Sequence, residues 1–251
     1  DSAGNAGGGT SLALEPTYPH TPHISYRDAA SDGLKHAWLS GTTWLSETVD
    51  SGCGPTSLAL MPTYPYTPCI SYDGCSRRLK FSWLEGTTWI SNTVPGIDAC
   101  CSSLALEPTY PYTPHISYHW AWDAATLYHA HLSGTAWMSG TWVREPVEPH
   151  GSNVGWWSSL ALEPNYPYAP HISYYDSTND DSKHAWLSGT VWLSETVDSA
   201  GNVGAFTSLA LNSSGNPHVS YLDLTNDALK YAWLSDTTWL SETVDSTGQP
   251  P

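Results

Sequence analysis

Three glutamates stand at one recurring place in the sequence and are the first candidates for chemistry. Each directly follows a Ser-Leu-Ala-Leu segment, and the five residues at this place are Glu15, Met61, Glu107, Glu163 and Asn212. Carboxylates held close together raise one another's pKa, attract a cation, or serve as the acid and base of a glycosidase, which needs two of them at a defined separation. A turn position that prefers polar residues is the competing explanation, and we favour it over catalysis.

Two histidines two residues apart, His129 and His131, are the second candidate. If their segment is a strand, both side chains point to the same face and can bind zinc, with His119, Asp123 or His150 as a third ligand. A strong zinc motif fixes its third ligand by spacing, and this sequence does not. We therefore favour a locally altered repeat over a metal site.

Acidic and amide residues cluster in two further segments, 176–181 and 223–227, where they offer oxygen ligands for calcium. Neither segment has the full pattern of a calcium-binding loop, and the same residue types close hairpin turns. We therefore expect no cofactor, with calcium or zinc as the alternatives.

Tyrosine is concentrated in proline-rich segments such as residues 107–114. Proline stiffens a segment, and a rigid tyrosine offers a large contact area at low entropic cost. These segments predict a platform for a glycan or a peptide, built from Tyr18, Tyr64, Tyr66, Tyr110, Tyr112, Tyr166 and Tyr168. The alternative is that the rings fold back as lids over the strand ends. Further binding candidates, expected at the opposite end, are Trp120, Trp122, Trp156 and Trp157.

An internal repeat reveals the elements that carry these residues. Ser-Leu-Ala-Leu begins at residues 11, 57, 103, 159 and 208, at intervals of 46, 46, 56 and 49 residues. Each copy continues with His-Ile-Ser-Tyr or a close variant, then with a segment like residues 34–39. A fourth segment begins at Trp44, Trp89, Trp137, Trp192 or Trp239. All four segments are short and lie between turn-forming residues, so each is predicted to be a strand.

Four strands in a repeat of this length fit one blade of a β-propeller. The predicted fold is all-β, a five-bladed β-propeller of four-stranded antiparallel blades in a single domain, residues 1–251. The blades are expected near residues 10–55, 56–101, 102–157, 158–206 and 207–251, each with its first strand innermost. The third blade is expected to carry an insertion of about six residues after Trp137, within residues 140–149. Shared positions such as His23 are interpreted as bonded core residues.

The repeat resembles that of secreted bacterial β-propellers, Ser-Leu-Ala-Leu-Asp-x-x-Gly-x-Pro-His-Ile-Ser-Tyr-Tyr-Asp, most closely in residues 208–221. The resemblance covers nearly the whole chain and implies the propeller fold and secretion. It implies no activity, because such propellers have none in common. In its number of blades the chain is also similar to five-bladed lectins of the tachylectin type, although their motifs are not found here.

Composition narrows the class of partner. The formal charge of −16 repels phosphate backbones and anionic lipids, so we expect no nucleic acid as a partner. We also expect no membrane insertion, because the sequence has no run of 18 apolar residues. Five cysteines lie close together in the sequence, and the pairings Cys69–Cys75 and Cys53–Cys100 are both open. Cys69 takes the place of a histidine in the other copies and is interpreted as a small buried residue.

We predict an extracellular or cell-surface binding module that recognises a carbohydrate or a protein surface through aromatic loops at one end of the propeller. The first alternative is a structural subunit of a larger extracellular assembly or a homo-oligomer. A glycoside hydrolase that uses Glu15, Glu107 and Glu163 is the weaker alternative. The sequence contains no nucleophile elbow, phosphate loop or dinucleotide fingerprint, so we do not expect an enzyme.

Overall fold

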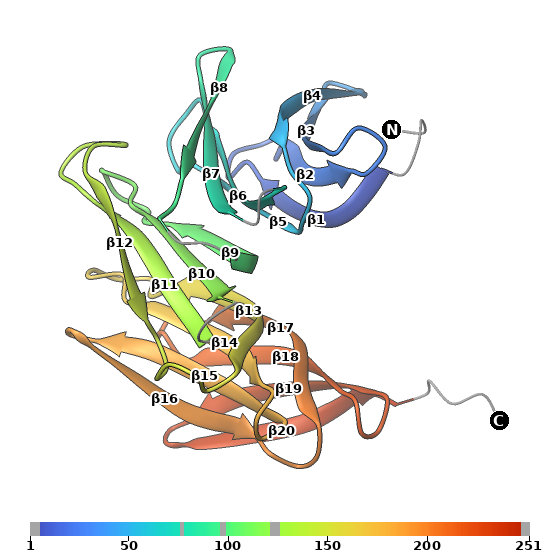
Figure 1. Ribbon diagram of the computed structural model, residues 1–251, viewed down its shortest axis with the longest axis vertical. Helices are drawn as coiled ribbons and strands as arrows, with labels where there is room; N and C mark the ends of the chain where they lie inside the picture. The colour runs from blue at the N-terminus through green and yellow to red at the C-terminus, as the bar shows by residue number, and fades with distance from the viewer. Residues whose placement is uncertain (1–5, 76–77, 96–98, 121–125, 247–251) are drawn as a thin grey trace. The chain divides into compact units, whose positions relative to one another are not determined.

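The computed structural model describes residues 6–75, 78–95, 99–120 and 126–246, and all regular structure in these residues is β-strand. Twenty strands form five antiparallel sheets of four strands, and within each sheet the strands lie in chain order (Figure 1). Each sheet is one copy of the repeat, as predicted, and we call it a blade. No helix in the described residues is long and apolar enough to cross a membrane.

The strand bounds follow the repeat closely. The first blade holds β1 (Ala6–Leu14), β2 (Pro22–Asp28), β3 (Gly33–Ser40) and β4 (Thr43–Ser51). The second holds β5 (Thr56–Leu60), β6 (Pro68–Gly74), β7 (Arg78–Glu85) and β8 (Thr88–Thr93). The third holds β9 (Ala99–Leu106), β10 (Pro114–Trp120), β11 (Thr126–Ser133) and β12 (Thr141–Pro146). The fourth holds β13 (Val154–Leu162), β14 (Pro170–Asp176), β15 (Asp181–Ser188) and β16 (Val191–Asp198), and the fifth holds β17 (Val203–Leu211), β18 (Pro217–Asp223), β19 (Ala228–Ser235) and β20 (Thr238–Asp245).

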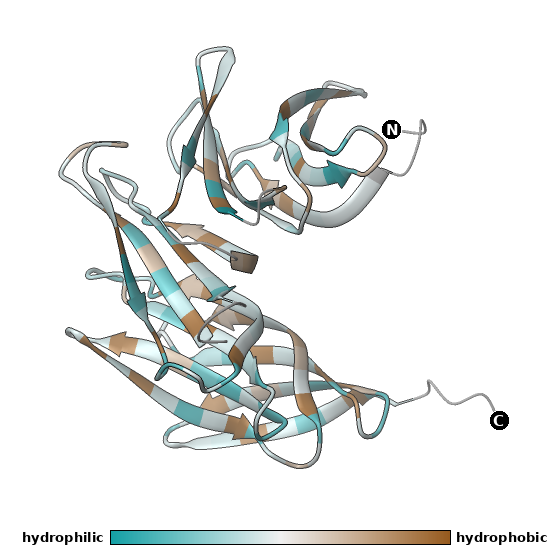
Figure 2. Cartoon of the chain, in the orientation of Figure 1, coloured by the Kyte–Doolittle hydropathy of each residue, from teal (hydrophilic) through white to brown (hydrophobic). Residues whose placement is uncertain are grey.

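The chain forms two compact units. One comprises Asp1–Ile116 with Ala130–Arg144, and the other comprises Ser117–His129 with Glu145–Pro251. The first two blades lie entirely in the first unit and the last two in the second, while strands of the third blade contribute to both. Hydrophobic and hydrophilic residues alternate along many strands (Figure 2), so one blade can bury its apolar residues against the next.

The hydrophobic core of each unit lies between consecutive blades. In the first unit Leu34 of the first blade packs with Leu58, Ile70 and Tyr72 of the second. In the second unit Val197 of the fourth blade packs with apolar residues of the fifth blade, namely Val203, Leu209, Val219, Tyr221 and Ala232. The repeat thus buries apolar side chains between sheets, which explains why one copy needs a neighbour to fold.

In three blades a serine of the first strand links it to the first strand of the next blade. The backbone N–H of Leu58 donates to Oγ of Ser11 at 3.0 Å, and that of Leu104 donates to Ser57 at 3.0 Å. In the second unit the N–H of Leu209 donates to Ser159 at the same distance. The first strands of neighbouring blades therefore lie side by side, and the serine of Ser-Leu-Ala-Leu is needed for blade-to-blade contact.

The serine of His-Ile-Ser-Tyr makes a second link between blades. Ser25 lies 2.7 Å from the hydroxyl of Thr56, and Ser173 lies 2.8 Å from that of Thr207. Each threonine in turn donates to a backbone carbonyl of the preceding blade. Both hydroxyls of each pair are buried, so they satisfy each other where water is excluded.

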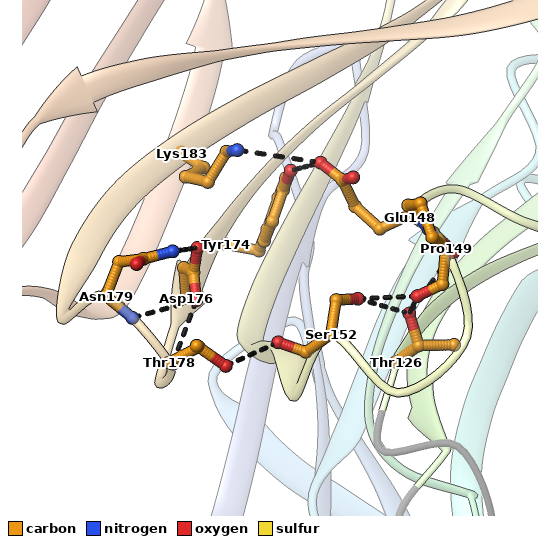
Figure 3. A network of polar contacts seen from close by, with 9 residues as sticks. All are labelled: Thr126, Glu148, Pro149, Ser152, Tyr174, Asp176, Thr178, Asn179 and Lys183. Atoms are coloured by element: carbon orange, nitrogen blue, oxygen red, sulfur yellow. Dashed lines mark hydrogen bonds and ion pairs between the residues drawn. The ribbon is translucent and has the colours of Figure 1, made fainter.

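An acid at the end of a fourth strand makes a third link. Asp50 accepts hydrogen bonds from the hydroxyl of Tyr72 at 2.5 Å and from the ammonium of Lys80 at 2.7 Å. Figure 3 shows the counterpart in the second unit, where Glu148 accepts from Tyr174 and pairs with Lys183. In the second, fourth and fifth blades the tyrosine of His-Ile-Ser-Tyr or its variant is thus a buried hydrogen-bond donor to the preceding blade.

The acidic turns predicted to close hairpins do so. Asp176 accepts the backbone N–H groups of Thr178 and Asn179 and the side-chain amide of Asn179 (Figure 3). Asp223 makes the same three bonds in the next blade. These carboxylates are therefore engaged in turn formation.

Glycine is required where a linker joins the next first strand. Gly204 has φ +107°, and a Cβ there would lie 2.6 Å from Cα of Ser182. Gly155 has φ +102°, and its Cβ would lie 2.7 Å from Cβ of Leu127. The pairing registers of β13 with β14 and of β17 with β18 shift just after these glycines. The close approach and the positive φ both exclude a larger residue.

The structure corrects two sequence predictions. The insertion of the third blade precedes the fourth strand: residues 134–140 form the turn, Trp137 lies in that turn, and Trp142 is the tryptophan of β12. The spacing in the sequence gave the wrong place for the insertion because two tryptophans, Trp137 and Trp142, follow β11. The disulfide joins Cys53 to Cys75, so neither predicted pairing forms. Cys53 reaches this position because its N–H donates to the carbonyl of Asp73 in the next blade.

Candidate functional site

A row of four polar side chains crosses the first blade, one from each strand or strand end. Glu15 lies 3.4 Å from Nε2 of His23, whose Nδ1 lies 3.0 Å from Nε2 of His36. Nδ1 of His36 lies 3.2 Å from Glu47. The strand register produces this row, because His36 pairs with Ser25 and Glu47, and so stands diagonal to His23. We call the positions of these four residues the polar row.

The fourth blade repeats the row in the second unit. Glu163 lies 3.4 Å from Nε2 of His171, and Nδ1 of His171 lies 3.0 Å from Nε2 of His184. Nδ1 of His184 lies 3.1 Å from Glu195. The agreement of all three distances with the first blade shows one arrangement built twice.

Tryptophans border the row. Trp38 stacks on His36 with 5.2 Å between ring centroids, and Trp186 stacks on His184 at 5.4 Å. The next blade adds an edge-on ring to each central histidine: Trp89 lies 5.5 Å from His36. These rings exclude water from the central histidine and leave the outer carboxylates half-buried.

Each row forms one wall of a cavity between two blades. In the first unit the cavity has a volume of about 370 Å³, and the row with Trp38 faces Pro65, Tyr66 and the turn near Gly86 of the second blade. In the second unit a cavity of about 410 Å³ lies between the fourth row with Trp186 and the turns of the fifth blade, which include Asn216 and Asp236. Two equivalent pockets therefore exist, each inside one unit.

Burial favours the neutral form of three of the row histidines. It lowers the pKa of His36 and of His171 to about 4 and also lowers the pKa of His23. At the far end of the fourth row, burial opposes ionisation of Glu195, but the hydrogen bond from His184 holds the pKa of the carboxyl below its ordinary value. Burial thus favours neutral imidazoles in both pockets, and the hydrogen bond from His184 favours the ionised form of Glu195 in the second.

The third blade has the same residue types with one addition. Glu107 lies 3.3 Å from Nε2 of His115. Nδ1 of His129 lies 3.2 Å from Glu145, which also accepts the indole N–H of Trp192 at 3.0 Å. His131 occupies the position of Trp38. The two predicted zinc ligands, His129 and His131, do lie on one strand, and zinc binding there stays a prediction.

The second and fifth blades replace the row. In the second, Met61, Cys69, Phe81 and Asn92 stand at its four positions, and Cys69 is fully buried as predicted. In the fifth blade the positions hold Asn212, His218, Tyr231 and Glu242. Here the amide of Asn212 lies 3.4 Å from Nε2 of His218, and Nδ1 of His218 lies 2.6 Å from the hydroxyl of Tyr231.

The tyrosine-rich loops adopt both of the predicted orientations. The first tyrosine of each loop is exposed, and these residues are Tyr18, Tyr64, Tyr110 and Tyr166. The second tyrosine folds back: Tyr66 and Tyr168 are buried, Tyr112 is half-buried, and Tyr66 bonds to Thr17 at 3.1 Å. Tyr66 thereby becomes a wall of the first pocket, while ligand binding by the exposed tyrosines stays a prediction.

The tryptophans predicted to bind at the opposite end lie in aromatic clusters. Trp156 stacks on His119 at 4.2 Å, and Trp157 lies 4.6 Å from Phe206. Trp120 packs edge-on to Tyr128 at 5.2 Å. Trp122, together with Asp123, lies outside the described residues.

Sequence reasoning singled out Glu15 and Glu163, which line the two pockets, and their counterpart Glu107, but it did not single out the other pocket residues. It assigned each carboxylate to a turn or a shared axial cluster, whereas each contacts a histidine of its own blade. The missed pocket residues are His36, Trp38 and Glu47 with their fourth-blade counterparts. A signal was present, because all four row positions change together in the second copy, while the first, third and fourth copies keep the same four residue types.

No protein-family model matches the chain, and no curated protein matches it. Several solved structures of other proteins do match the chain. A lectin from Burkholderia pseudomallei aligns with a TM-score of 0.66 and 15% identity, over 92% of this chain and 68% of the lectin. The fucose-recognising lectin of Aleuria aurantia, a six-bladed β-propeller, aligns with a TM-score of 0.64 and 12% identity, over 96% and 80%. An ulvan lyase, a polysaccharide lyase bound to GlcA(1-4)Rha3S, aligns with a TM-score of 0.60 and 13% identity, over 94% and 70%. The β-propeller fold of the blades is thus confirmed, and membership of a secreted bacterial repeat family stays a prediction.

Proposed function

We propose that this protein is a carbohydrate-binding module that holds sugars in the pockets between consecutive blades. The observation that carries the proposal is the repetition of one pocket in both units. Each pocket places an indole next to two carboxylates and two neutral imidazoles, in a cavity of about 370 or 410 Å³. A cavity of this size suits a sugar residue or a short oligosaccharide.

The chemistry of the pocket matches that of a sugar. A pyranose has an apolar face that packs on an aromatic ring, and Trp38 supplies such a ring at the first pocket. Its hydroxyl groups donate hydrogen bonds, and Glu15 and Glu47 supply carboxylate acceptors on the same wall. The facing loop closes the pocket with Pro65 and Tyr66, which are rigid and add contact area.

The structural neighbours support this function. Two of them are lectins, and the Aleuria aurantia lectin has also been solved with Fucα1-6GlcNAc. Repeated shallow pockets on one chain also suit a lectin, because several weak sites on a multivalent glycan give avidity. A location outside the cytoplasm is part of the proposal, since the Cys53–Cys75 disulfide needs an oxidising compartment.

An enzymatic function is less well supported by the pockets. The ulvan lyase neighbour was solved with GlcA(1-4)Rha3S, an anionic sugar, and binding an anionic sugar calls for cationic side chains. The residues that line the two pockets include four glutamates and one aspartate but no lysine or arginine. A glycosidase that uses Glu15 and Glu163 stays the weaker alternative.

The test is a glycan array that includes Fucα1-6GlcNAc and is probed with the wild-type chain, a pocket variant and a loop variant. The pocket variant is Trp38→Leu with Trp186→Leu, and the loop variant replaces the exposed Tyr18, Tyr64 and Tyr166 by alanine. We expect the wild type and the loop variant to bind sugars and the pocket variant to lose binding by at least tenfold, because it lacks the stacking rings. Binding lost only in the loop variant would move the site to the exposed tyrosines. Absence of binding by the wild type would refute the proposal and favour the structural-subunit alternative.

A further inference from the structure

The polar row has fewer protons than contacts at neutral pH. Three contacts join the four groups Glu163, His171, His184 and Glu195, and each needs one proton to be a hydrogen bond. An ionised carboxylate contributes no proton to these contacts, and a neutral imidazole contributes one proton. With two carboxylates and two imidazoles, the row therefore holds two protons for three contacts. One contact must therefore bring two acceptors face to face.

The fifth blade shows in which direction the protons point. Oδ1 of Asn212 accepts the backbone N–H groups of Ser214 and Asn216, at 2.9 and 3.0 Å, so its Nδ2 faces His218. An amide nitrogen only donates, and Nε2 of His218 is therefore the acceptor. Its proton sits on Nδ1 and is donated to Tyr231. In the fifth blade the histidine at this position therefore carries its proton on Nδ1 and leaves Nε2 bare.

The same direction fits the fourth and first blades. The ionised Glu195 accepts Nδ1–H of His184, and Nε2 of His184 accepts Nδ1–H of His171. Nε2 of His171 then faces Glu163 without a proton, and this is the longest of the three contacts, 3.4 Å against 3.0 and 3.1 Å. In the first blade the Glu15–His23 contact is likewise the longest, at 3.4 Å.

We propose that Nε2 of His23 and the carboxylate of Glu15, with their counterparts His171 and Glu163, form an acceptor pair that is completed by a donor from the ligand. The donor is a hydroxyl of a neutral sugar or the ammonium of an amino sugar, and acidic sugars are rejected. A third proton taken up by the row fills the same gap, so protons and sugar compete and binding weakens in acid. The inference rests on the proposed function and names the ligand class and the pH response of the same site.

The charged and titratable groups around each acceptor pair favour a ligand that donates a hydrogen bond. In the first pocket the neighbours of His23 are Glu15, His36, Glu47 and Tyr66, and none of them is a cation at neutral pH. In the second pocket they are Glu163, His184, Glu195 and Asp236. His23 and His171 are only 7% and 6% exposed, so bulk water reaches the bare nitrogen poorly and a ligand donor replaces it at little cost.

The first experiment needs no sugar. Nitrogen NMR of the wild-type chain labelled with ¹⁵N-histidine distinguishes a bare from a protonated Nε2, with His23→Cys and His171→Cys used only to assign the signals. Cysteine is chosen because the second blade already folds with Cys69 at this position. We expect Nε2 of both histidines to be bare at pH 7. A protonated Nε2 at either would overturn the inference, whatever the protein binds.

The second experiment measures the dissociation constants of Fucα1-6GlcNAc, glucosamine and glucuronic acid between pH 7 and pH 3, with the wild type and with the double variant Glu15→Gln, Glu163→Gln. Burial lowers the pKa of His36 and of His171 to about 4, and one proton competes with one ligand. The constants of the first two sugars should therefore stay nearly constant down to about pH 5, rise about twofold by about pH 4, and approach a tenfold rise per pH unit below it. Glucuronic acid should not bind. The variant places an amide against Nε2, as Asn212 does, and should bind at least tenfold more weakly with no pH dependence.

The outcomes separate the two proposals. Sugar binding that is independent of pH, or unchanged in the glutamine variant, would overturn the acceptor pair and leave the lectin function intact. Preferential binding of glucuronic acid would overturn the ligand class. Bare Nε2 atoms without binding of any sugar tested would overturn the proposed function and this ligand class together.

Discussion

Replacing Asp198 by alanine tests whether the acid that ends a fourth strand holds the next blade in place. Its carboxylate accepts the hydroxyl of Tyr221 at 2.7 Å and pairs with the ammonium of Lys230. The Asp198 side chain is 7% exposed and that of Lys230 is 12% exposed. Burial opposes ionisation, but the hydrogen bonds from Lys230 and Tyr221 outweigh it and hold the pKa of Asp198 below its ordinary value.

The expected loss of unfolding free energy depends on the two groups that lose their partner in the variant, the ammonium of Lys230 and the hydroxyl of Tyr221. Removing one partner of a buried ion pair costs about 3 to 5 kcal/mol, because the other charge remains poorly solvated, and an unbonded buried hydroxyl adds about 1 kcal/mol. Lys230 keeps part of its access to water, so we expect Asp198→Ala to lower the free energy of unfolding by roughly 3 kcal/mol. Asp50→Ala breaks the same contacts to Tyr72 and Lys80 where the pair is 23% and 24% exposed, and should cost about 1 kcal/mol.

The assay is urea denaturation at pH 7, combined with hydrogen exchange to assign the loss to β17–β20. The difference in unfolding free energy between the wild type and Asp198→Ala should disappear in acid. The folded pKa of Asp198 lies below its unfolded value of about 3.8, so its contribution is present above that pH and vanishes as the pH falls through the folded pKa. A loss below 1 kcal/mol for Asp198→Ala, or a larger loss for Asp50→Ala, would refute the claim that burial of this link sets its strength.

Two further predictions concern stability. Ser159→Ala removes the acceptor of the Leu209 N–H and should lower the free energy of unfolding by about 1 kcal/mol in urea denaturation, whereas the exposed Ser188→Ala should change nothing measurable. Burial lowers the pKa of His119 to about 4, below its unfolded value of 6.5. The unfolded state therefore binds the extra proton, and stability should fall by up to about 3 kcal/mol between pH 6.5 and pH 4, an effect that urea midpoints would show to be smaller in His119→Phe.

The repeat made the blades predictable, because short segments of the same type recur between turn-forming residues. The period alone could not align the third blade, where Trp137 and Trp142 both fit the fourth strand. The residues that follow Trp142 settle the choice, since Glu145 and Val147 match Glu47 and Val49 of the first blade. Alignment on a whole strand pattern would have placed the insertion correctly.

The pocket and the disulfide were harder to predict, because both depend on which blade surfaces meet. The Cys53–Cys75 bond joins a linker to a hairpin turn of the following blade, and no rule of spacing relates the two. Trp38 and Glu47 look like ordinary strand residues in the sequence. Trp38 and Glu47 become pocket residues only because their part of the third and fourth strands faces the Pro65–Tyr66 loop of the neighbouring blade.

The second blade shows that the polar row is not required for folding. Its row positions hold Met61, Cys69 and Phe81, yet the blade keeps four strands, a buried Ile70 and the serine link to β9. An apolar row is the cheaper solution for a buried site, since it leaves no polar group to satisfy. The first and fourth blades nevertheless keep two glutamates and two histidines in the row. In the arrangement proposed above, one of the three contacts between these groups lacks a proton and is not a hydrogen bond. A polar arrangement that the fold does not need, and that is complete only with an added donor, is what a ligand-binding site requires.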